Sequence, residues 1–253
     1  MTVVPVPVPD CAVPARPPVP GGRARPVGGR PRAAPASDLA IAGLTPLSSC
    51  DWPDHLVATA FLQGCPWRCT YCHNAAILDP RIPGTVSWSD VLDLLGRRRR
   101  LLDGLVFSGG EPTRQPGLLD AARQVRAAGF GVGLHTSGAY PRRLASLLPL
   151  VDWVGLDIKA PARLYRAVTR TGGPTTSADA AFASLRLILD AGVDVQVRTT
   201  VDPTVLCAAD VAELTGTLTR LGVHDHVLQE VRAEGTTREY QAALAGTRAA
   251  PTG

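Results

Sequence analysis

The chain has 253 residues and is 45% hydrophobic, which suits one large globular core. It contains no run of eighteen apolar residues and no basic segment followed by an apolar one at its start, so neither a membrane span nor a secretory signal is predicted. The net charge of +4 arises in residues 1–37, where five arginines face one acid, and the other 21 basic and 21 acidic residues cancel. Bulk charge therefore gives no argument for a nucleic-acid partner, and we expect a cytoplasmic protein that binds neither nucleic acid nor membrane.

Residues 1–37 also hold ten of the 23 prolines. Such a segment cannot bury enough apolar surface to order itself, so we expect a disordered tail rich in proline, glycine and arginine. Globular sequence begins near Asp38 and continues as one core domain over residues 38–235. We expect residues 236–253 to form a C-terminal extension.

Strand and helix patterns alternate along the core domain. The apolar run at 56–62 predicts a buried strand, and Ser87 with Asp90 three residues later predicts the start of a helix that ends near the arginines at 97–100. Further strands are predicted at 105–108, 131–135, 153–157, 195–200 and 227–231, and further helices at 118–128, 141–148, 178–191 and 208–221.

Repeated βα units form parallel sheets with right-handed crossovers. Six units are too few for a closed eight-stranded barrel. The predicted fold class is therefore α/β, a partial (β/α)6 TIM-like barrel with parallel strands, and a doubly wound sheet is the alternative. In either fold, functional groups gather at the carboxyl ends of the strands. Polar or ionisable residues follow all six predicted strands, at 65–74, 108–113, 135–138, 157–159, 198–200 and 229–232.

The first of these strand ends carries Cys65, Cys69 and Cys72, in a C-x3-C-x2-C spacing that allows three thiolates to face one inorganic centre. Iron–sulfur clusters that transfer electrons are usually held by four cysteines, and structural zinc sites close with four ligands. Three thiolates leave one position open, where a substrate or cofactor can bind. The alternative is a structural zinc site completed by His55 or His73.

Two further patterns point to a ligand. Gly109 and Gly110 allow close approach to the backbone, and Glu111 beside them can accept hydrogen bonds from an ammonium group. The composition is also biased, because 25 arginines accompany a single lysine, Lys159, and Asn74 is the only asparagine. A lysine that persists in such a sequence suggests a need for its compact ammonium group.

Together these motifs resemble the radical S-adenosylmethionine (SAM) superfamily. Within it, the chain is similar to the glycyl-radical-enzyme activases, in particular the activating proteins of anaerobic ribonucleoside-triphosphate reductase. The similar stretch runs from about Leu39 to Arg232, and its anchors are residues 51–53, 61–74, 107–113, 135–138, 156–159 and 198–201.

The resemblance implies a role for each matched residue. Cys65, Cys69 and Cys72 would bind three irons of a [4Fe–4S] cluster, and the fourth iron would take the amino and carboxylate groups of the methionine part of SAM. Tyr71 stands where the family packs the adenine. Gly109, Gly110 and Glu111 would bind the amino group of the methionine part of SAM.

The resemblance extends to the later strands. Asp157 and Lys159 would lie near the zwitterionic end of SAM, and Arg198 would bind the SAM carboxylate or the backbone of the substrate. Family members hold a monovalent cation near the third and fourth strand ends, which would involve Thr136 and Asp157. This chain has His135 where others carry an acid, which puts that cation in doubt.

The implied activity is reductive cleavage of SAM to a 5′-deoxyadenosyl radical, which generates a glycyl radical on a large partner enzyme, here anaerobic ribonucleotide reductase. Only one cysteine motif is present, so a flavodoxin or ferredoxin is expected to supply the electron. Two alternatives stay open at this point. One is a radical SAM enzyme that acts on a small molecule of the deazaguanine type, and the other is a non-enzymatic metal-binding interaction module.

Overall fold

The computed structural model describes residues 34–171 and 176–249. Residues 1–33 of the predicted tail therefore lie outside the described residues. The described chain forms one seven-stranded sheet whose strands follow one another in sequence order. The six strands from β2 to β7 are parallel, and β1 is antiparallel to β2. The strands are β1 (Ile41–Ser48), β2 (Val57–Leu62), β3 (Gly104–Gly109), β4 (Gly131–Thr136), β5 (Trp153–Asp157), β6 (Asp194–Val201) and β7 (His226–Glu230).

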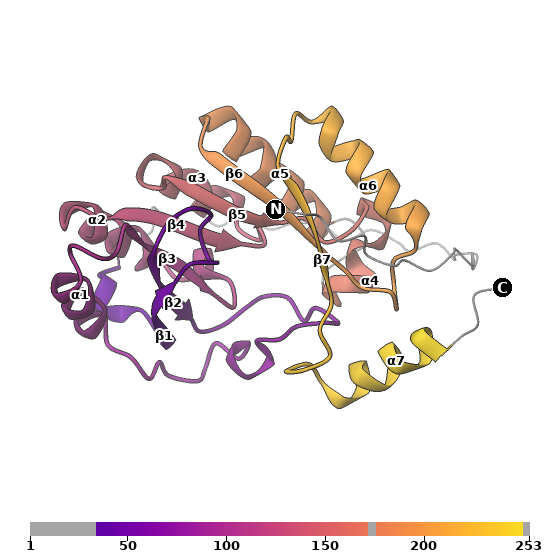
Figure 1. The fold of residues 1–253 in the computed structure, drawn as a ribbon, viewed down its shortest axis with the longest axis horizontal. Coiled ribbons are helices and arrows are strands. Elements are labelled where there is room, and N and C mark those ends of the chain that lie inside the picture. The colour runs from indigo at the N-terminus through magenta and orange to yellow at the C-terminus, as the bar shows by residue number, and fades with distance from the viewer. Residues whose placement is uncertain (1–33, 172–175, 250–253) are drawn as a thin grey trace, which may run out of the picture.

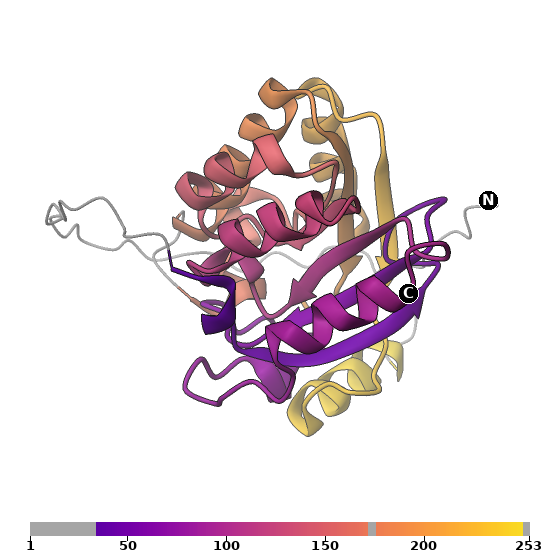
Figure 2. The ribbon, with the colours of Figure 1, turned by 90° about the vertical axis from the view of Figure 1, so that its left-hand side faces the viewer.

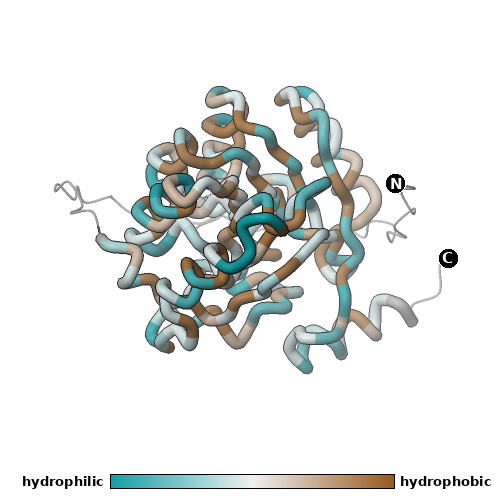
Figure 3. The backbone as a smooth tube through the Cα atoms, turned by 60° about the vertical axis from the view of Figure 1, so that its left-hand side comes forward, coloured by the Kyte–Doolittle hydropathy of each residue, from teal (hydrophilic) through white to brown (hydrophobic). Residues whose placement is uncertain are grey.

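Helices cover the outer face of this curved sheet, and its inner face encloses the interior of a half barrel (Figures 1 and 2). Apolar and polar segments alternate along the outer helices, as expected for helices that pack one face on a sheet (Figure 3). Within the described ranges, no helix combines the length and apolar character needed to cross a membrane. The helices are α1 (Trp88–Arg97), α2 (Leu118–Ala127), α3 (Pro141–Leu147), α4 (Tyr165–Thr169), α5 (Thr176–Ala191), α6 (Ala208–Arg220) and α7 (Arg238–Ala249).

The predicted partial barrel of six parallel strands is confirmed, and the doubly wound sheet is wrong because the helices lie on one face. Ser87 and Asp90 form the predicted capping box at the start of α1. The antiparallel strand β1 was missed. It contains Gly43 and Pro46, residues typical of sheet edges, and its register with β2 shifts twice. Helices α4 and α7 were also missed, and the boundary at residue 235 stays a prediction.

The two-residue period of the strands separates two sets of side chains. One set faces the helices and forms the main apolar core, to which Leu105, Leu134 and Leu156 belong, each at most 1% exposed. The other set faces the interior of the half barrel. In β3 and β5 this interior set begins with the apolar residues Val106 and Trp153 and ends with the polar residues Ser108 and Asp157.

Trp52 closes the interior at the amino ends of the strands. It lies in the connection between β1 and β2 and forms a second apolar cluster with Val57, Val106 and Trp153. Its ring stacks on that of Trp153, with 5.9 Å between the centroids. Gly133 leaves the room for this indole, because a Cβ there would lie 2.9 Å from an atom of the Trp52 ring. The family anchor at 51–53 therefore has a packing role.

Replacing Trp52 by Ala should lower the free energy of unfolding by about 3–5 kcal/mol, because the indole fills the base of the barrel and a cavity would remain. Urea denaturation monitored by circular dichroism measures the change. Leu56→Ala provides the control, since Leu56 is 38% exposed and its truncation should cost less than about 1 kcal/mol. Equal effects of the two substitutions would contradict the role of Trp52.

Candidate functional site

A cavity of about 240 Å³ opens at the carboxyl ends of the strands. All three cysteines of the motif contribute to its wall, together with residues from β3, β4, β5, β6 and β7. Every residue predicted from the resemblance to hold the cluster or SAM lines this cavity, apart from Glu111. The lining predicted residues are Cys65, Tyr71, Cys69, Cys72, Gly109, Gly110, Thr136, Asp157, Lys159 and Arg198. Their binding roles stay predictions.

The cysteine loop is held by backbone hydrogen bonds on two sides. At its start, the amides of Gly64 and Cys65 donate to the carbonyls of Ile77 and Leu78, at 2.7 and 3.1 Å. Further along, the amides of Arg68 and Thr70 donate to the carbonyls of Thr169 and Val168 in α4, both at 3.0 Å. The loop therefore presents its cysteines from a fixed backbone, although it contains no helix or strand between residues 63 and 74.

Burial is the main cause of raised pKa values for all three thiols. The pKa of Cys65 rises to about 12 and that of Cys69 to about 11, and the pKa of Cys72 also rises. Without a metal, these thiols are protonated at neutral pH. Since thiolates are the form that binds metal, loading this site must release protons.

The three thiols share a cavity but do not converge on one point. Among the described residues, no three His, Cys, Asp or Glu side chains come together as the ligands of a single metal ion. Structural zinc sites close with four ligands, whereas three thiols on one cavity wall leave a position of a metal centre open. The residues present therefore fit an iron–sulfur cluster with an open position.

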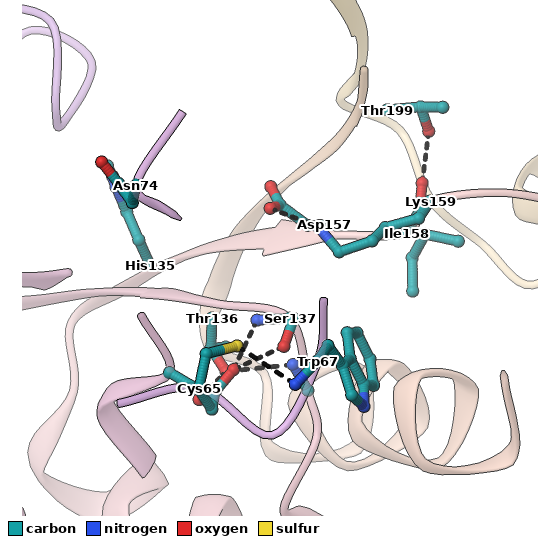
Figure 4. Close-up of polar contacts among 12 residues, drawn as sticks. Cys65, Trp67, Asn74, His135, Thr136, Ser137, Asp157, Ile158, Lys159 and Thr199 are labelled. Carbon is teal, nitrogen blue, oxygen red and sulfur yellow. Dashed lines mark hydrogen bonds and ion pairs between the residues drawn. The ribbon is translucent and has the colours of Figure 1, made fainter. Parts of the chain in front are cut away.

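Lys159 and Asp157 form a partly buried ion pair beside the cysteines (Figure 4). The Lys159 Nζ lies 3.1 Å from an Asp157 carboxylate oxygen and 5.7 Å from the centroid of the Tyr71 ring. Burial lowers the pKa of Lys159, but the Asp157 carboxylate together with Tyr71 and Cys69 outweighs burial and holds that pKa well above its usual range. The Lys159 side chain is 7% exposed and that of Asp157 is 46% exposed, so the carboxylate is the more accessible partner.

Arg198 places a second cation in the same cavity. Its guanidinium packs over Trp153, 5.4 Å from the ring centroid, and occupies the space that a side chain at Gly155 would need. Within the described residues, its Nε and Nη2 atoms are buried without a hydrogen-bond partner. Burial raises the pKa of Asp157, but Lys159 and then Arg198 outweigh burial and lower it. The carboxylate is thus held ionised between two cations.

His135 is neutral at physiological pH. Burial and then the charge of Arg198 lower its pKa to about 4. Its Nε2 lies 2.6 Å from the carbonyl oxygen of Asp51 and must donate to it, which leaves Nδ1 to accept from the Ser108 hydroxyl at 3.3 Å. His135 therefore links the connection below the barrel to a hydroxyl on the cavity wall, and it carries no charge that replaces the acid of other family members.

Glu111 is the one predicted SAM ligand that does not line the cavity. Its carboxylate is fully buried and accepts five hydrogen bonds, from the amide and hydroxyl groups of Thr113 and Ser137 and from the hydroxyl group of Thr136. Thr113 follows β3, Thr136 is the last residue of β4 and Ser137 comes directly after it. The Glu111 side chain thus joins two neighbouring strand ends, and the Thr136 hydroxyl is directed to it as well.

The glycine pair packs against the cysteine loop. The amides of Gly110 and Glu111 donate to the carbonyls of Leu62 and Gly64, at 2.9 and 3.0 Å. A Cβ at Gly110 would lie 2.5 Å from the Gly64 carbonyl oxygen, so this position needs a glycine. Asn74 adds a third link, because its side-chain amide donates to the Gly109 carbonyl at 3.1 Å. The two motifs form one unit.

Several cavity residues were not predicted as ligands from the sequence. Ser108 and Thr200 stand on strands at positions that face the interior, so the strand period was the signal that could have found them. Ser137 follows β4 directly, outside the strand, so the strand period could not have indicated that it lines the cavity. The cavity wall also includes Trp67, His73, Asn74 and Gln229.

The fold and the site define a class of protein, a half barrel of parallel strands that holds an inorganic cofactor at the strand ends. The family model of the Radical SAM superfamily matches residues 59–208. A Methanocaldococcus jannaschii protein named as a glycyl-radical enzyme activating enzyme is 31% identical over 186 residues, covering 70% of this chain and 75% of the relative. The chain therefore belongs to the radical SAM superfamily, among the glycyl-radical-enzyme activating enzymes.

Two further comparisons were informative, one of sequence and one of structure. The pyruvate formate-lyase-activating enzyme of Clostridium pasteurianum is 30% identical over 150 residues, which cover 57% of this chain and 61% of the relative. The solved structure of anSMEcpe with bound AdoMet has a TM-score of 0.52 at 17% identity, and the match covers 67% of this chain and 48% of that one. The chain thus spans about half of that structure, and the likeness shows a shared fold.

Glu111→Gln should lower the free energy of unfolding by about 2–3 kcal/mol, because a side-chain NH2 group would face a hydroxyl or amide donor and hydrogen bonds to a charged group would be lost. Chemical denaturation of the apoprotein measures the change. Asp93→Asn is the matched control, since it is an equally conservative change at an exposed carboxylate in the middle of α1. A Glu111→Gln variant as stable as the control would show that the five hydrogen bonds contribute little.

Proposed function

We propose that this protein cleaves SAM reductively at a [4Fe–4S] cluster and generates a glycyl radical on anaerobic ribonucleoside-triphosphate reductase. The observation that supports this best is the shared cavity. Three half-buried thiols line it, and the ion pair of Lys159 and Asp157 lies beside them with the guanidinium of Arg198. A thiolate-bound metal centre next to paired charges suits a zwitterionic cofactor.

Each group of residues then has a task. Cys65, Cys69 and Cys72 bind three irons, and the bound cluster and SAM together supply the one-electron cleavage that starts the reaction. Lys159 and Arg198 attract the carboxylate of the methionine part, since both cations face the cavity and Arg198 has unpaired N–H groups. Asp157 offers an accessible carboxylate oxygen to an amino or hydroxyl group.

The walls of the cavity protect the chemistry from water. Tyr71 and Trp67 are 6% and 5% exposed, and both lie within the cysteine loop. Trp67 packs edge-on against Tyr165 of α4, with 5.9 Å between the ring centroids. These aromatic rings shield one side of the cysteines, while the half barrel stays open for a polypeptide loop that carries the target glycine.

The proposed partner and electron donor follow from the sequence. The anchors at 51–53 and 61–74 resemble the activating proteins of anaerobic ribonucleoside-triphosphate reductase, which favours that enzyme as the partner. The chain has one cluster motif and no second cysteine set, so an external flavodoxin or ferredoxin supplies the electron. Both the cluster and such donors need a reducing compartment, which supports the cytoplasm.

Anaerobic reconstitution with iron and sulfide tests the proposal. The wild-type protein should take up four irons per chain and form 5′-deoxyadenosine from SAM with dithionite, and Cys65→Ala, Cys69→Ala or Cys72→Ala should abolish both. With the reductase and SAM, an electron paramagnetic resonance doublet of a glycyl radical should appear. Zinc in place of iron, or no 5′-deoxyadenosine, would rule out the enzyme. An active cluster without a doublet would instead favour a small-molecule substrate.

Lys159→Arg should weaken SAM binding about tenfold or more, because a hydrogen bond between charged groups contributes about 1.5–3 kcal/mol and the bulkier guanidinium does not fit beside Asp157 and Tyr71. Equilibrium dialysis of labelled SAM against the reconstituted protein measures the dissociation constant. Arg166→Lys, the reverse exchange at an exposed position on α4, is the control. Unchanged affinity in Lys159→Arg would remove the special role of the only lysine.

A further inference from the structure

The C-terminal segment of the described chain contacts the cysteine loop through a buried carboxylate. Asp202 follows β6 directly and is fully buried. One of its oxygens accepts a hydrogen bond of 2.5 Å from the hydroxyl group of Thr70, the residue between Cys69 and Tyr71. Hydrogen bonds to a carboxylate are roughly twice as strong as those between neutral groups, so this contact fixes the centre of the loop.

The second oxygen of Asp202 is bound from the other side. It accepts a hydrogen bond of 2.8 Å from the hydroxyl group of Tyr240, which lies in the first turns of α7 and is 3% exposed. It also accepts from the amide and hydroxyl groups of Thr204, at 3.0 and 2.6 Å. A single carboxylate therefore joins the cysteine loop, the end of β6 and the C-terminal helix.

A second contact lies on the far side of Cys72. The Nδ1 atom of His73 is 2.8 Å from the carbonyl oxygen of Glu234, and since a carbonyl only accepts, His73 donates. The chain at Gly235 then passes close to the His73 backbone, where a Cβ would lie 3.5 Å from the His73 carbonyl oxygen. The C-terminal segment thus contacts the loop directly at His73 and, through Asp202, at Thr70, on both sides of Cys72.

The contacting segment is itself ordered by internal hydrogen bonds. The side chain of Gln241 donates to the carbonyls of Ala233 and Thr236, both at 3.1 Å, and the Thr236 hydroxyl donates to the Ala233 carbonyl at 2.5 Å. These bonds close the turn that leads from β7 into α7. The segment therefore presents Glu234 and Tyr240 from a fixed backbone, as a positioning element requires.

We propose that residues 233–249 act through Asp202 and His73 as a clamp that positions Cys69 and Cys72 for the cluster. The inference rests on the proposed function, in which these cysteines bind a [4Fe–4S] cluster. Residues 233–249 lie beyond the stretch 59–208 that the family model matches, so the clamp is an addition to the common core. Thr70, Asp202 and Tyr240 are positioning residues, because none of them lines the cavity.

Hydrogen exchange in the full-length apoprotein tests the clamp without a cluster. The amides of Arg68 and Thr70 are hydrogen-bonded to α4 and report on loop opening. Tyr240→Phe and Thr70→Val should each speed exchange in residues 65–74 about tenfold, since each removes a buried hydrogen bond to a charged group. Thr70→Ser, which keeps the hydroxyl group, should restore the wild-type rate. Thr247→Ala, elsewhere on α7, is the control.

The reconstituted protein provides the second measurement. Loss of iron to a chelator should be about tenfold faster in Tyr240→Phe and Thr70→Val than in wild type or Thr70→Ser. The electron paramagnetic resonance signal of the reduced cluster should broaden in the first two variants only, because the cysteines would no longer hold one geometry. A change in folding stability alone would leave that line shape unaltered.

The outcomes separate the two proposals. Wild-type exchange rates, iron retention and line shape in Tyr240→Phe and Thr70→Val would overturn the clamp, even with an active enzyme. A wild-type protein that takes up no cluster would overturn the proposed function, while the exchange measurement would still decide whether residues 233–249 restrain the loop.

Discussion

The structure depends on the two-residue period of six parallel strands. Alternate side chains pack under the helices and supply the apolar core, so the side chains between them must face the interior of the half barrel. The cysteine loop lies at the carboxyl ends of the strands and lines the cavity there. Trp52 fills the other end, while His135, Asp157 and Arg198 occupy inward positions in the carboxyl-terminal halves of their strands. Because the apolar residues of each strand are used on the face that the helices cover, the charged residues lie on the face that lines the interior of the half barrel.

The charges inside the barrel are interdependent. Asp157 is ionised because Lys159 and Arg198 face it, and both cations are buried where they would otherwise be costly. Burial and then Arg198 keep His135 neutral, and its single ring N–H donates to the Asp51 carbonyl. The cysteine thiols lie next to these cations. A thiolate-bound centre carries negative charge, so the cations proposed to attract the SAM carboxylate would also stabilise that centre.

Much of this arrangement was predictable from local sequence. The helix period, the capping box of Ser87 and Asp90, and polar residues after each strand were sufficient to predict the half barrel and most of the cavity wall. The antiparallel strand β1 was not predictable, because Pro46 and its irregular register hide the strand pattern. The orientation of Glu111 was not predictable either, because donors from two loops decide it. Contacts between segments far apart in sequence, such as Thr70 with Asp202, leave no periodic signal.

Gly155 has a consequence for how this sequence can vary. The guanidinium of Arg198 occupies the space above that glycine, so any larger residue at 155 would expel it from its place over Trp153. Moving the cation would weaken its electrostatic effect on the pKa values of Asp157 and His135 together, although neither residue had been altered. Positions 155 and 198 are therefore coupled through space, because the lack of a side chain at one gives the cation at the other its place over Trp153.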